Sequence, residues 1–242
     1  MTTKDYKAAL VARYRGRVYV PAAEQPKGLF KDKVMHDVTP GPFASLEARL
    51  GVTGQSFKPG PPTEADTATP MDIKKVDRVI VHHTAGNRNA SAAAIDRYHR
   101  LPVSASKKSK PKSAIAYHYL IKYDGTIERG RSTHWFGDHA GQRDNLRSIA
   151  VVFAGNFMNY PPSEAQIASG AKLIAGIKSQ LGISRVQGHG EPEGYKTLCP
   201  GKNMNMDALR RRIDQYQGSS AIAGESCPTC GGPVWVDGIH VN

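Results

Sequence analysis

The chain has 242 residues, a formal net charge of +12 and a hydrophobic content of 39%. This length and composition are typical of a folded globular protein with one sizeable core, and no apolar run approaches the roughly 20 residues of a membrane span. The positive charge indicates an anionic partner, but neither zinc-finger spacing with a following helix nor an aromatic sheet signature accompanies it, so we expect no nucleic-acid binding.

The N-terminal region gives weak structural signals and no sign of its role. The segment "MTTKDYKAALVARYRGR" lacks the apolar core of a signal peptide, so we expect synthesis and retention in the cytoplasm. The stretch "KPGPPTEADTATP" is almost free of large apolar residues and predicts a linker. Three elements are predicted before it: a helix over 4–14, a strand over 17–21, and a helix over 44–50 ended by Gly51.

Beyond the linker, strands and helices alternate, which predicts an α/β fold with a mixed central β-sheet flanked by helices. Asp124-Gly125 is expected to form a type I′ turn between two hairpin strands. Ser163 and Gly182 are expected to bound a long amphipathic helix. The predicted elements are strands at 78–83, 148–155 and 184–189, a hairpin at 117–131, and helices at 90–100, 163–182 and 205–217.

These signals predict four parts of the chain. They are an N-terminal segment of unknown role (1–57), a linker (58–74), the α/β domain (75–217), and a flexible C-terminal tail (218–242) that carries a Cys-x-x-Cys motif.

A pair of histidines ends the first strand of the α/β domain, in "VIVHHTAG" at 79–86. Adjacent strand residues point to opposite faces of a sheet, so only one imidazole of the pair easily faces a given site. The pair taken alone favours a solvated or hydrogen-bonded strand end over a metal or catalytic role.

A second stretch, "GHGEPEGYKTLCPG" at 188–201, lacks helical periodicity and is predicted to be a loop after a strand. It holds His189 and Cys199, and imidazole with thiolate is a donor set that suits Zn²⁺. The strand-end histidine supplies a third ligand if the two strands are neighbours. Three protein ligands with one open position describe a catalytic zinc site, whereas a structural site is closed by four.

Four blocks in order carry a resemblance to a known family: "VIVHHTAG", "AYHYLIKYDGTIERGR", "DHAG…SIAVVFAGN" and "GHGEPEGYKTLCPG". Residues 75–217 thereby resemble the zinc-dependent N-acetylmuramoyl-L-alanine amidases, the superfamily that also includes the peptidoglycan recognition proteins. The resemblance implies that His82, the first histidine of the pair, binds zinc together with His189 and Cys199. His83 is then expected on the opposite face, in a packing or supporting role.

The resemblance also assigns expected roles to other residues. Tyr117 matches the family's active-site tyrosine, although a strand aromatic is the ordinary alternative. Thr197 lies at the catalytic position two residues before the Cys ligand, with Lys196 beside it. His139 matches a histidine that lines the substrate groove, or else is a surface loop histidine. Glu191 is expected to be a plain loop carboxylate rather than a partner that supports the ligands or a general base.

The implied activity is hydrolysis of the peptidoglycan amide between N-acetylmuramic acid and L-alanine, by water that Zn²⁺ activates. The expected protein is a bacteriolytic phage endolysin, made in the host cytoplasm without a signal peptide and released through a membrane pore. Two alternatives stay open, a peptidoglycan-binding module without activity and a cytosolic amidase that recycles muropeptides. Because the resemblance implies that loss of the Cys ligand marks the receptors, Cys199 favours an enzyme.

A lysine-rich loop precedes Tyr117, in "SASKKSKPKS" at 104–113. Such a run is either solvated surface or a contact with anionic cell-wall polymers near the groove. The lysines concerned are Lys107, Lys108, Lys110 and Lys112.

The tail motif "CPTCGG" at 227–232 resembles half of a zinc ribbon. Cys227, Cys230 and His240 offer three of the four ligands that a structural zinc needs, so a second chain or water would complete the site. Zinc binding there would allow a dimer through the tail, and the alternatives are redox chemistry of the Cys pair and an unliganded flexible tail.

Overall fold

The structure, a computed structural model, describes residues 36–37, 39–60, 63, 68–102, 104 and 109–222. The helix and strand expected before residue 22, and the Cys-x-x-Cys motif of the tail, lie outside these residues. Within them, no helix is long and apolar enough to cross a membrane.

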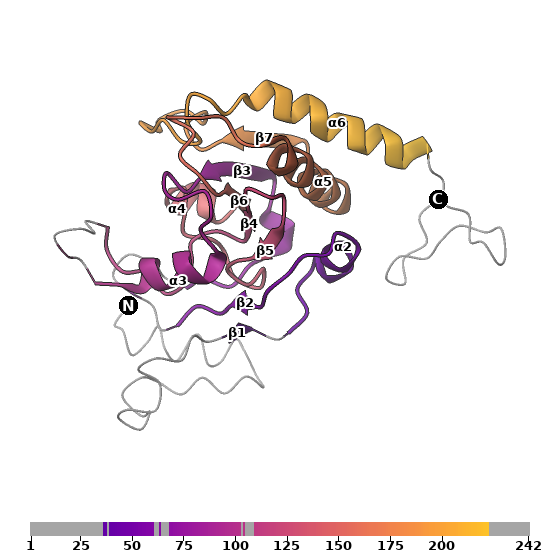
Figure 1. The fold of residues 1–242 in the computed structure, drawn as a ribbon. Coiled ribbons are helices and arrows are strands. Elements are labelled where there is room, and N and C mark those ends of the chain that lie inside the picture. The colour runs from indigo at the N-terminus through magenta and orange to yellow at the C-terminus, as the bar shows by residue number, and fades with distance from the viewer. Residues whose placement is uncertain are drawn as a thin grey trace. The chain divides into compact units, whose positions relative to one another are not determined.

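A five-stranded mixed sheet forms the centre of the described part, with strand order β5-β4-β6-β3-β7. β3 pairs in parallel with β6 on one side and β7 on the other, β4 pairs in parallel with β6, and β5 closes the sheet as an antiparallel edge. The α/β fold with a mixed central sheet is therefore confirmed (Figure 1). The strands span Arg78–His83 (β3), Tyr119–Ile121 (β4), Ile127–Arg129 (β5), Ser148–Phe153 (β6) and Arg185–Gly188 (β7).

Helices flank this sheet (Figure 1). α5 packs across β3, β4 and β6, and α6 packs on α5 and β7. The expected caps of α5 are present: Ser163 forms a capping box with Gln166, and Gly182 ends the helix with a φ of 63°. Ser91 caps α3 by accepting from the Ala94 N–H. The helices span Ala44–Arg49 (α2), Ala92–Arg100 (α3), Gly141–Asn145 (α4), Glu164–Leu181 (α5) and Met206–Ile222 (α6), and Ile73–Lys75 form a short 3₁₀ helix.

Alternation along β3 separates the core from the opposite face of the sheet. Val79 and Val81 are fully buried in the hydrophobic cluster that α5 covers. His83 lies on that side too, where its Nδ1 accepts from the Phe157 N–H at 3.1 Å. His82 is buried on the other face of the sheet, because adjacent residues of a strand point to opposite faces.

Residues from the region that we assigned to the N-terminal segment contribute to the same core. Phe43, Leu46 and Val52 are buried in it, and β1 (His36–Asp37) pairs with β2 (Ser56–Phe57) in a separate two-stranded sheet. The compact unit that contains the sheet starts at Met35. The boundaries of the functional domain stay a prediction.

Glu47 of α2 holds this region to the sheet. Its carboxylate accepts from the Tyr119 hydroxyl and from Arg129 Nε, both at 2.7 Å, and the residue is 6% exposed. Glu47→Ala leaves the buried Tyr119 hydroxyl without this acceptor and removes one of the acceptors of the Arg129 guanidinium. We expect the free energy of unfolding to fall by about 2–3 kcal/mol in urea denaturation, the cost of losing hydrogen bonds to a charged group.

Glu164 provides the matched control, because its ion pair with Arg212 lies at the surface and its side chain is 75% exposed. Glu164→Ala should cost less than about 1 kcal/mol. An equal loss of unfolding free energy in both variants would mean that the hydrogen bonds of Glu47 contribute no more than a surface ion pair.

The hairpin between β4 and β5 is confirmed, but its turn is not type I′. Among the described residues, positive φ outside glycine occurs at Ala68 and Ala85, so Asp124 has a negative φ, whereas Gly125 has a φ of 88°. The Gly125 N–H donates to Lys122 O at 2.9 Å. This is a type I turn followed by a left-handed glycine, because Asp124 accepts from the Thr126 N–H and favours a negative φ there.

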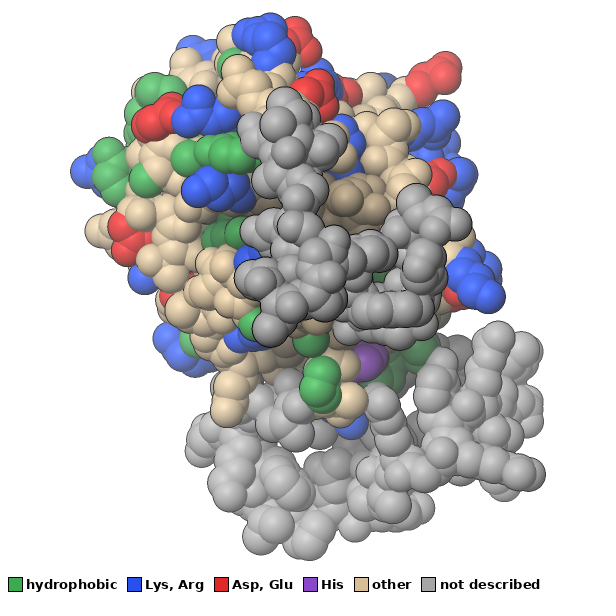
Figure 2. Space-filling view, turned by 90° about the vertical axis from the view of Figure 1, so that its right-hand side faces the viewer, with side chains coloured by type: hydrophobic (Ala, Val, Ile, Leu, Met, Phe, Trp, Pro, Cys, Tyr) green, Lys and Arg blue, Asp and Glu red, His purple; other side chains and the backbone are tan. Residues whose placement is uncertain are grey.

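The positive charge is not gathered into one patch on the coloured part of the face in Figure 2. Basic side chains are spread across that face with acidic side chains between them. On that part of the face the positive charge is therefore a diffuse field rather than a defined docking site.

Candidate metal centre

Three metal-binding side chains converge at one end of the sheet. The ligand atoms of His82, His189 and Cys199 all lie within 4.8 Å of one another. His82 ends β3 and His189 directly follows β7, where its N–H donates to Val81 O at 3.1 Å and extends the parallel pairing. The neighbouring strands required for the third ligand are thus present, and the loop after β7 returns Cys199 to the same place.

The donor set fits a tetrahedral Zn²⁺ ion. Zinc–nitrogen and zinc–sulfur bonds of usual length place two ligand atoms about 3.5 Å apart, and His82 Nδ1 lies 3.6 Å from Cys199 Sγ. Burial lowers the pKa of His82 and of His189, so both imidazoles offer a lone pair. Burial raises the pKa of the Cys199 thiol to about 11, so without a cation beside it this residue is no nucleophile at neutral pH.

Short contacts close the loop between His189 and Cys199. The Gly190 N–H donates to Cys199 O at 2.8 Å, and a Cβ on Gly190 would lie 2.4 Å from Thr197 O, so only glycine fits. Glu191 accepts from the Gly188 N–H at 2.8 Å and pairs with Arg210. These contacts give Glu191 a structural role in the loop, in agreement with the expectation of a plain carboxylate.

Tyr117 lies beside the three donors. Its ring centroid is 5.0 Å from that of His82, and burial, with Cys199 and Asp138 adding to it, raises the pKa of the phenol well above its usual value. The hydroxyl is therefore protonated at neutral pH and can donate a hydrogen bond. The ring of His99 lies 5.7 Å from Tyr117, a neighbour on α3 that no sequence pattern indicated.

The two residues before Leu198 differ in their contacts. Thr197 Oγ1 accepts from the Cys199 N–H at 3.2 Å, which places its hydroxyl next to a ligand and leaves its own proton to donate elsewhere. The Lys196 side chain is exposed on the same loop. The structure thus brings Thr197 to the donors and leaves Lys196 at the surface.

His139 lies against the candidate ligands rather than on an open surface. Its Nδ1 is 2.8 Å from His82 Nε2, and its Nε2 is 3.3 Å from the Ser148 hydroxyl. Ser148 begins β6 and is fully buried. Sequence reasoning associated His139 with the substrate groove and did not identify Ser148, which precedes an apolar strand and carries no motif.

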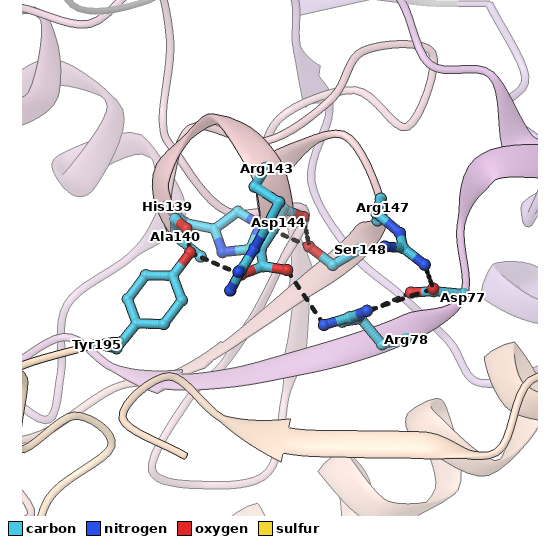
Figure 3. A network of polar contacts seen from close by, with 9 residues as sticks. All are labelled: Asp77, Arg78, His139, Ala140, Arg143, Asp144, Arg147, Ser148 and Tyr195. Carbon is cyan, nitrogen blue, oxygen red and sulfur yellow. Dashed lines mark hydrogen bonds and ion pairs between the residues drawn. The ribbon is translucent and has the colours of Figure 1, made fainter. Parts of the chain in front are cut away.

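A buried carboxylate, Asp144, connects this group to the loop after β7 (Figure 3). Asp144 Oδ2 accepts from the Tyr195 hydroxyl at 2.7 Å, and its Oδ1 accepts from Arg78 at 3.1 Å. Burial acts to raise the pKa of Asp144, but hydrogen bonds from Tyr195 and Arg143 outweigh it and the pKa is lowered. Tyr195 also contacts Ala140 O, and its ring packs edge-on to His189 at 5.3 Å.

We expect Tyr195→Phe to loosen the loop without unfolding the protein. The variant keeps the ring against His189 but loses the hydroxyl that joins the loop to Asp144. Hydrogen exchange of the loop amides should speed up about fivefold, which corresponds to a local opening energy lower by about 1 kcal/mol.

Tyr123→Phe is the control for this variant, because Tyr123 is 41% exposed and stands in the β4–β5 turn. Its substitution should leave exchange in the loop unchanged. Unchanged exchange in Tyr195→Phe as well would show that the other contacts hold the loop.

Of the four lysines before Tyr117, Lys112 is engaged inside the protein. It donates to Asp138 O at 2.9 Å and forms an ion pair with the Asp138 carboxylate, with 21% of its side chain exposed. The Lys112 ammonium is therefore not freely solvated, and its contact with wall polymers stays a prediction. Lys110 is exposed, and Lys107 and Lys108 lie outside the described residues.

Comparisons with known proteins identify a family and similar sequences. The sequence profile of the N-acetylmuramoyl-L-alanine amidases matches residues 72–202. Peptidoglycan recognition protein 1 of Mus musculus is 30% identical over 127 residues, which are 52% of this chain and 70% of the mouse protein. Peptidoglycan-recognition protein SC2 of Drosophila simulans is 30% identical over 161 residues, 65% of this chain and 85% of that protein.

Two solved structures from Clostridium intestinale URNW share the fold. The N-acetylmuramoyl-L-alanine amidase LysC is 28% identical, with a TM-score of 0.52, and the match covers 61% of this chain and 91% of that chain. The endolysin amidase LysCS is also 28% identical, with a TM-score of 0.51, over 61% of this chain and 90% of its own. The similar proteins thus include both amidases and recognition proteins.

Proposed function

The chain belongs to the N-acetylmuramoyl-L-alanine amidase family, and on this premise we propose that it is a zinc-dependent amidase that degrades peptidoglycan. The bond cleaved is the amide between N-acetylmuramic acid and the L-alanine of the stem peptide. The observation that carries the proposal is the convergence of His82, His189 and Cys199 beside a protonated Tyr117.

The residues divide the chemistry among them. His82, His189 and Cys199 would hold the metal, and a bound Zn²⁺ supplies a Lewis acid that polarises the scissile carbonyl and activates water. The Tyr117 hydroxyl donates to the carbonyl oxygen as negative charge develops on it. Thr197, whose own proton is not used by Cys199, provides a second donor, with Lys196 as the alternative. The departing L-alanine amine takes up a proton that comes from the attacking water.

The competing function is recognition of peptidoglycan without cleavage, which the similar recognition proteins favour. The complete donor set supports catalysis instead, because a binding protein needs no cysteine sulfur placed 3.6 Å from an imidazole nitrogen.

We further propose that the enzyme is a phage endolysin that acts on the host cell wall after release through a membrane pore. The likeness to an endolysin amidase supports this setting. A diffuse positive charge suits weak, salt-sensitive attraction to anionic wall polymers.

The test is to incubate the purified protein with intact peptidoglycan and with soluble muropeptides, and to identify the new ends by mass spectrometry. Cleavage should release stem peptides with a free L-alanine N-terminus and leave glycan chains with a free lactyl carboxylate. An endolysin should solubilise intact walls, whereas a recycling amidase should act on the soluble fragments alone.

The metal requirement is tested on the same preparation. Removal of zinc with a chelator should stop the reaction, and added Zn²⁺ should restore it. Wall binding without new ends, in protein that contains one zinc per chain, would establish the recognition function and exclude the amidase.

A further inference from the structure

His139 is contacted at both of its ring nitrogens. Nδ1 lies 2.8 Å from His82 Nε2, and Nε2 lies 3.3 Å from Ser148 Oγ. The Ser148 hydroxyl also contacts the backbone carbonyl oxygen of Asp144 at 2.6 Å, inside the protein where Ser148 is fully buried (Figure 3). Ser148, His139 and His82 therefore form one chain of hydrogen bonds that ends at the candidate metal ligands.

The direction of this chain follows from counting protons. A serine hydroxyl has one proton, and a carbonyl oxygen can only accept, so Ser148 donates to Asp144 O. The Ser148 oxygen can then only accept from His139. His139 Nε2 must therefore carry a hydrogen, which it donates to the Ser148 oxygen. A neutral imidazole has one N–H, so His139 Nδ1 is an acceptor.

The same count fixes the tautomer of His82. Its Nε2 must carry the hydrogen that His139 Nδ1 accepts, which leaves the lone pair on His82 Nδ1. That nitrogen is the one that lies 3.6 Å from Cys199 Sγ. Burial lowers the pKa of both His82 and His139, which agrees with two neutral rings.

We propose that Ser148 and His139 are positioning residues that hold His82 in the tautomer with a free Nδ1 and so preset it as a metal ligand. The proposal rests on the zinc site of the proposed function. His139 acts through His82 and need not touch the substrate. Partners of this kind orient a ligating histidine and fix which nitrogen binds the metal.

The decisive measurement is a long-range proton–nitrogen correlation spectrum of the zinc-free protein with ¹⁵N-labelled histidines. In the wild type, His82 and His139 should both show the tautomer with hydrogen on Nε2. In Ser148→Ala, His139 loses the acceptor for its Nε2–H, so both rings should show a mixture of tautomers. A wild-type His82 with hydrogen on Nδ1 would overturn the proposal without any variant.

Zinc affinity, measured by competition with a chelator, gives the second readout. Ser148→Ala should bind zinc about tenfold more weakly, and His139→Leu about 10–100-fold more weakly. His139→Asn should stay within about threefold of wild type, because its amide oxygen can accept from His82 in place of Nδ1. Rescue by Asn but not by Leu separates an acceptor role from simple filling of space.

Ser132→Ala controls for general loss of a buried hydroxyl, because Ser132 is 1% exposed and accepts from the His134 N–H away from the ligands. It should change neither tautomers nor zinc affinity. Wild-type zinc affinity and tautomers in Ser148→Ala would refute the positioning role while leaving the amidase intact. A wild type that binds no zinc would instead refute the proposed function.

Discussion

Cys199→Ala should abolish zinc binding and amide hydrolysis together. The variant removes the one donor of the three that becomes an anion, and the two remaining imidazoles cannot hold the ion tightly. Loss of a Lewis acid that contributes several kcal/mol corresponds to a rate lower by at least about 10³-fold. Zinc per chain is measured by elemental mass spectrometry, and the rate is followed by release of stem peptides.

The chain offers a matched thiol control in its tail. Cys227 and Cys230 are its other two cysteines and lie outside the described residues. Cys227→Ser with Cys230→Ser should keep the zinc held by Cys199 and the activity on soluble fragments. If the tail binds zinc, this double variant loses the extra metal and any dimer. Full activity of Cys199→Ala would refute the zinc mechanism.

Tyr117→Phe should keep zinc and lose rate by about 10²–10³-fold, the usual cost of removing one donor to a developing oxyanion. The ring stays against His82, so packing and metal binding are preserved while the hydroxyl is lost. Because burial raises the pKa of the phenol, the wild-type group is a proton donor throughout the neutral range. The loss should therefore appear in kcat and at every pH from about 6 to 8.

The measurement is steady-state kinetics on a soluble muropeptide, with zinc content determined on the same samples. Tyr123→Phe, an exposed tyrosine in the β4–β5 turn, should retain the wild-type rate. A wild-type kcat in Tyr117→Phe would show that Tyr117 is only an aromatic wall of the site.

Local sequence signals predicted the secondary structure well. Capping residues and apolar periodicity placed α3 and α5, and alternation placed the two histidines of β3 on opposite faces, because these features depend on neighbours within a few residues. The prediction of a type I′ turn at Asp124-Gly125 was wrong. The Asp-Gly pair is compatible with more than one turn type, and the strand register selects among them.

Local sequence patterns identified two of the three candidate ligands but did not connect them with the third. His189 and Cys199 share one loop, and their residue types alone indicated zinc. His82 lies 117 positions from Cys199, and only the resemblance to a family of amidases joined them. Their proximity depends on β3 pairing with β7, a long-range contact that no local pattern encodes.

By itself the sequence determined α2, α3, α5 and α6, the strands of the central sheet and the chemistry of the donors, because propensity, capping and side-chain type are properties of short segments. The tertiary structure alone decided that α2 and β2 pack with the sheet, that Lys112 pairs with Asp138, and that Ser148 reaches His139. Each of these depends on which surfaces the strand order brings together. The hydrogen bond of 3.3 Å between Ser148 at the start of β6 and His139 in the loop before α4 forms only when the core is packed.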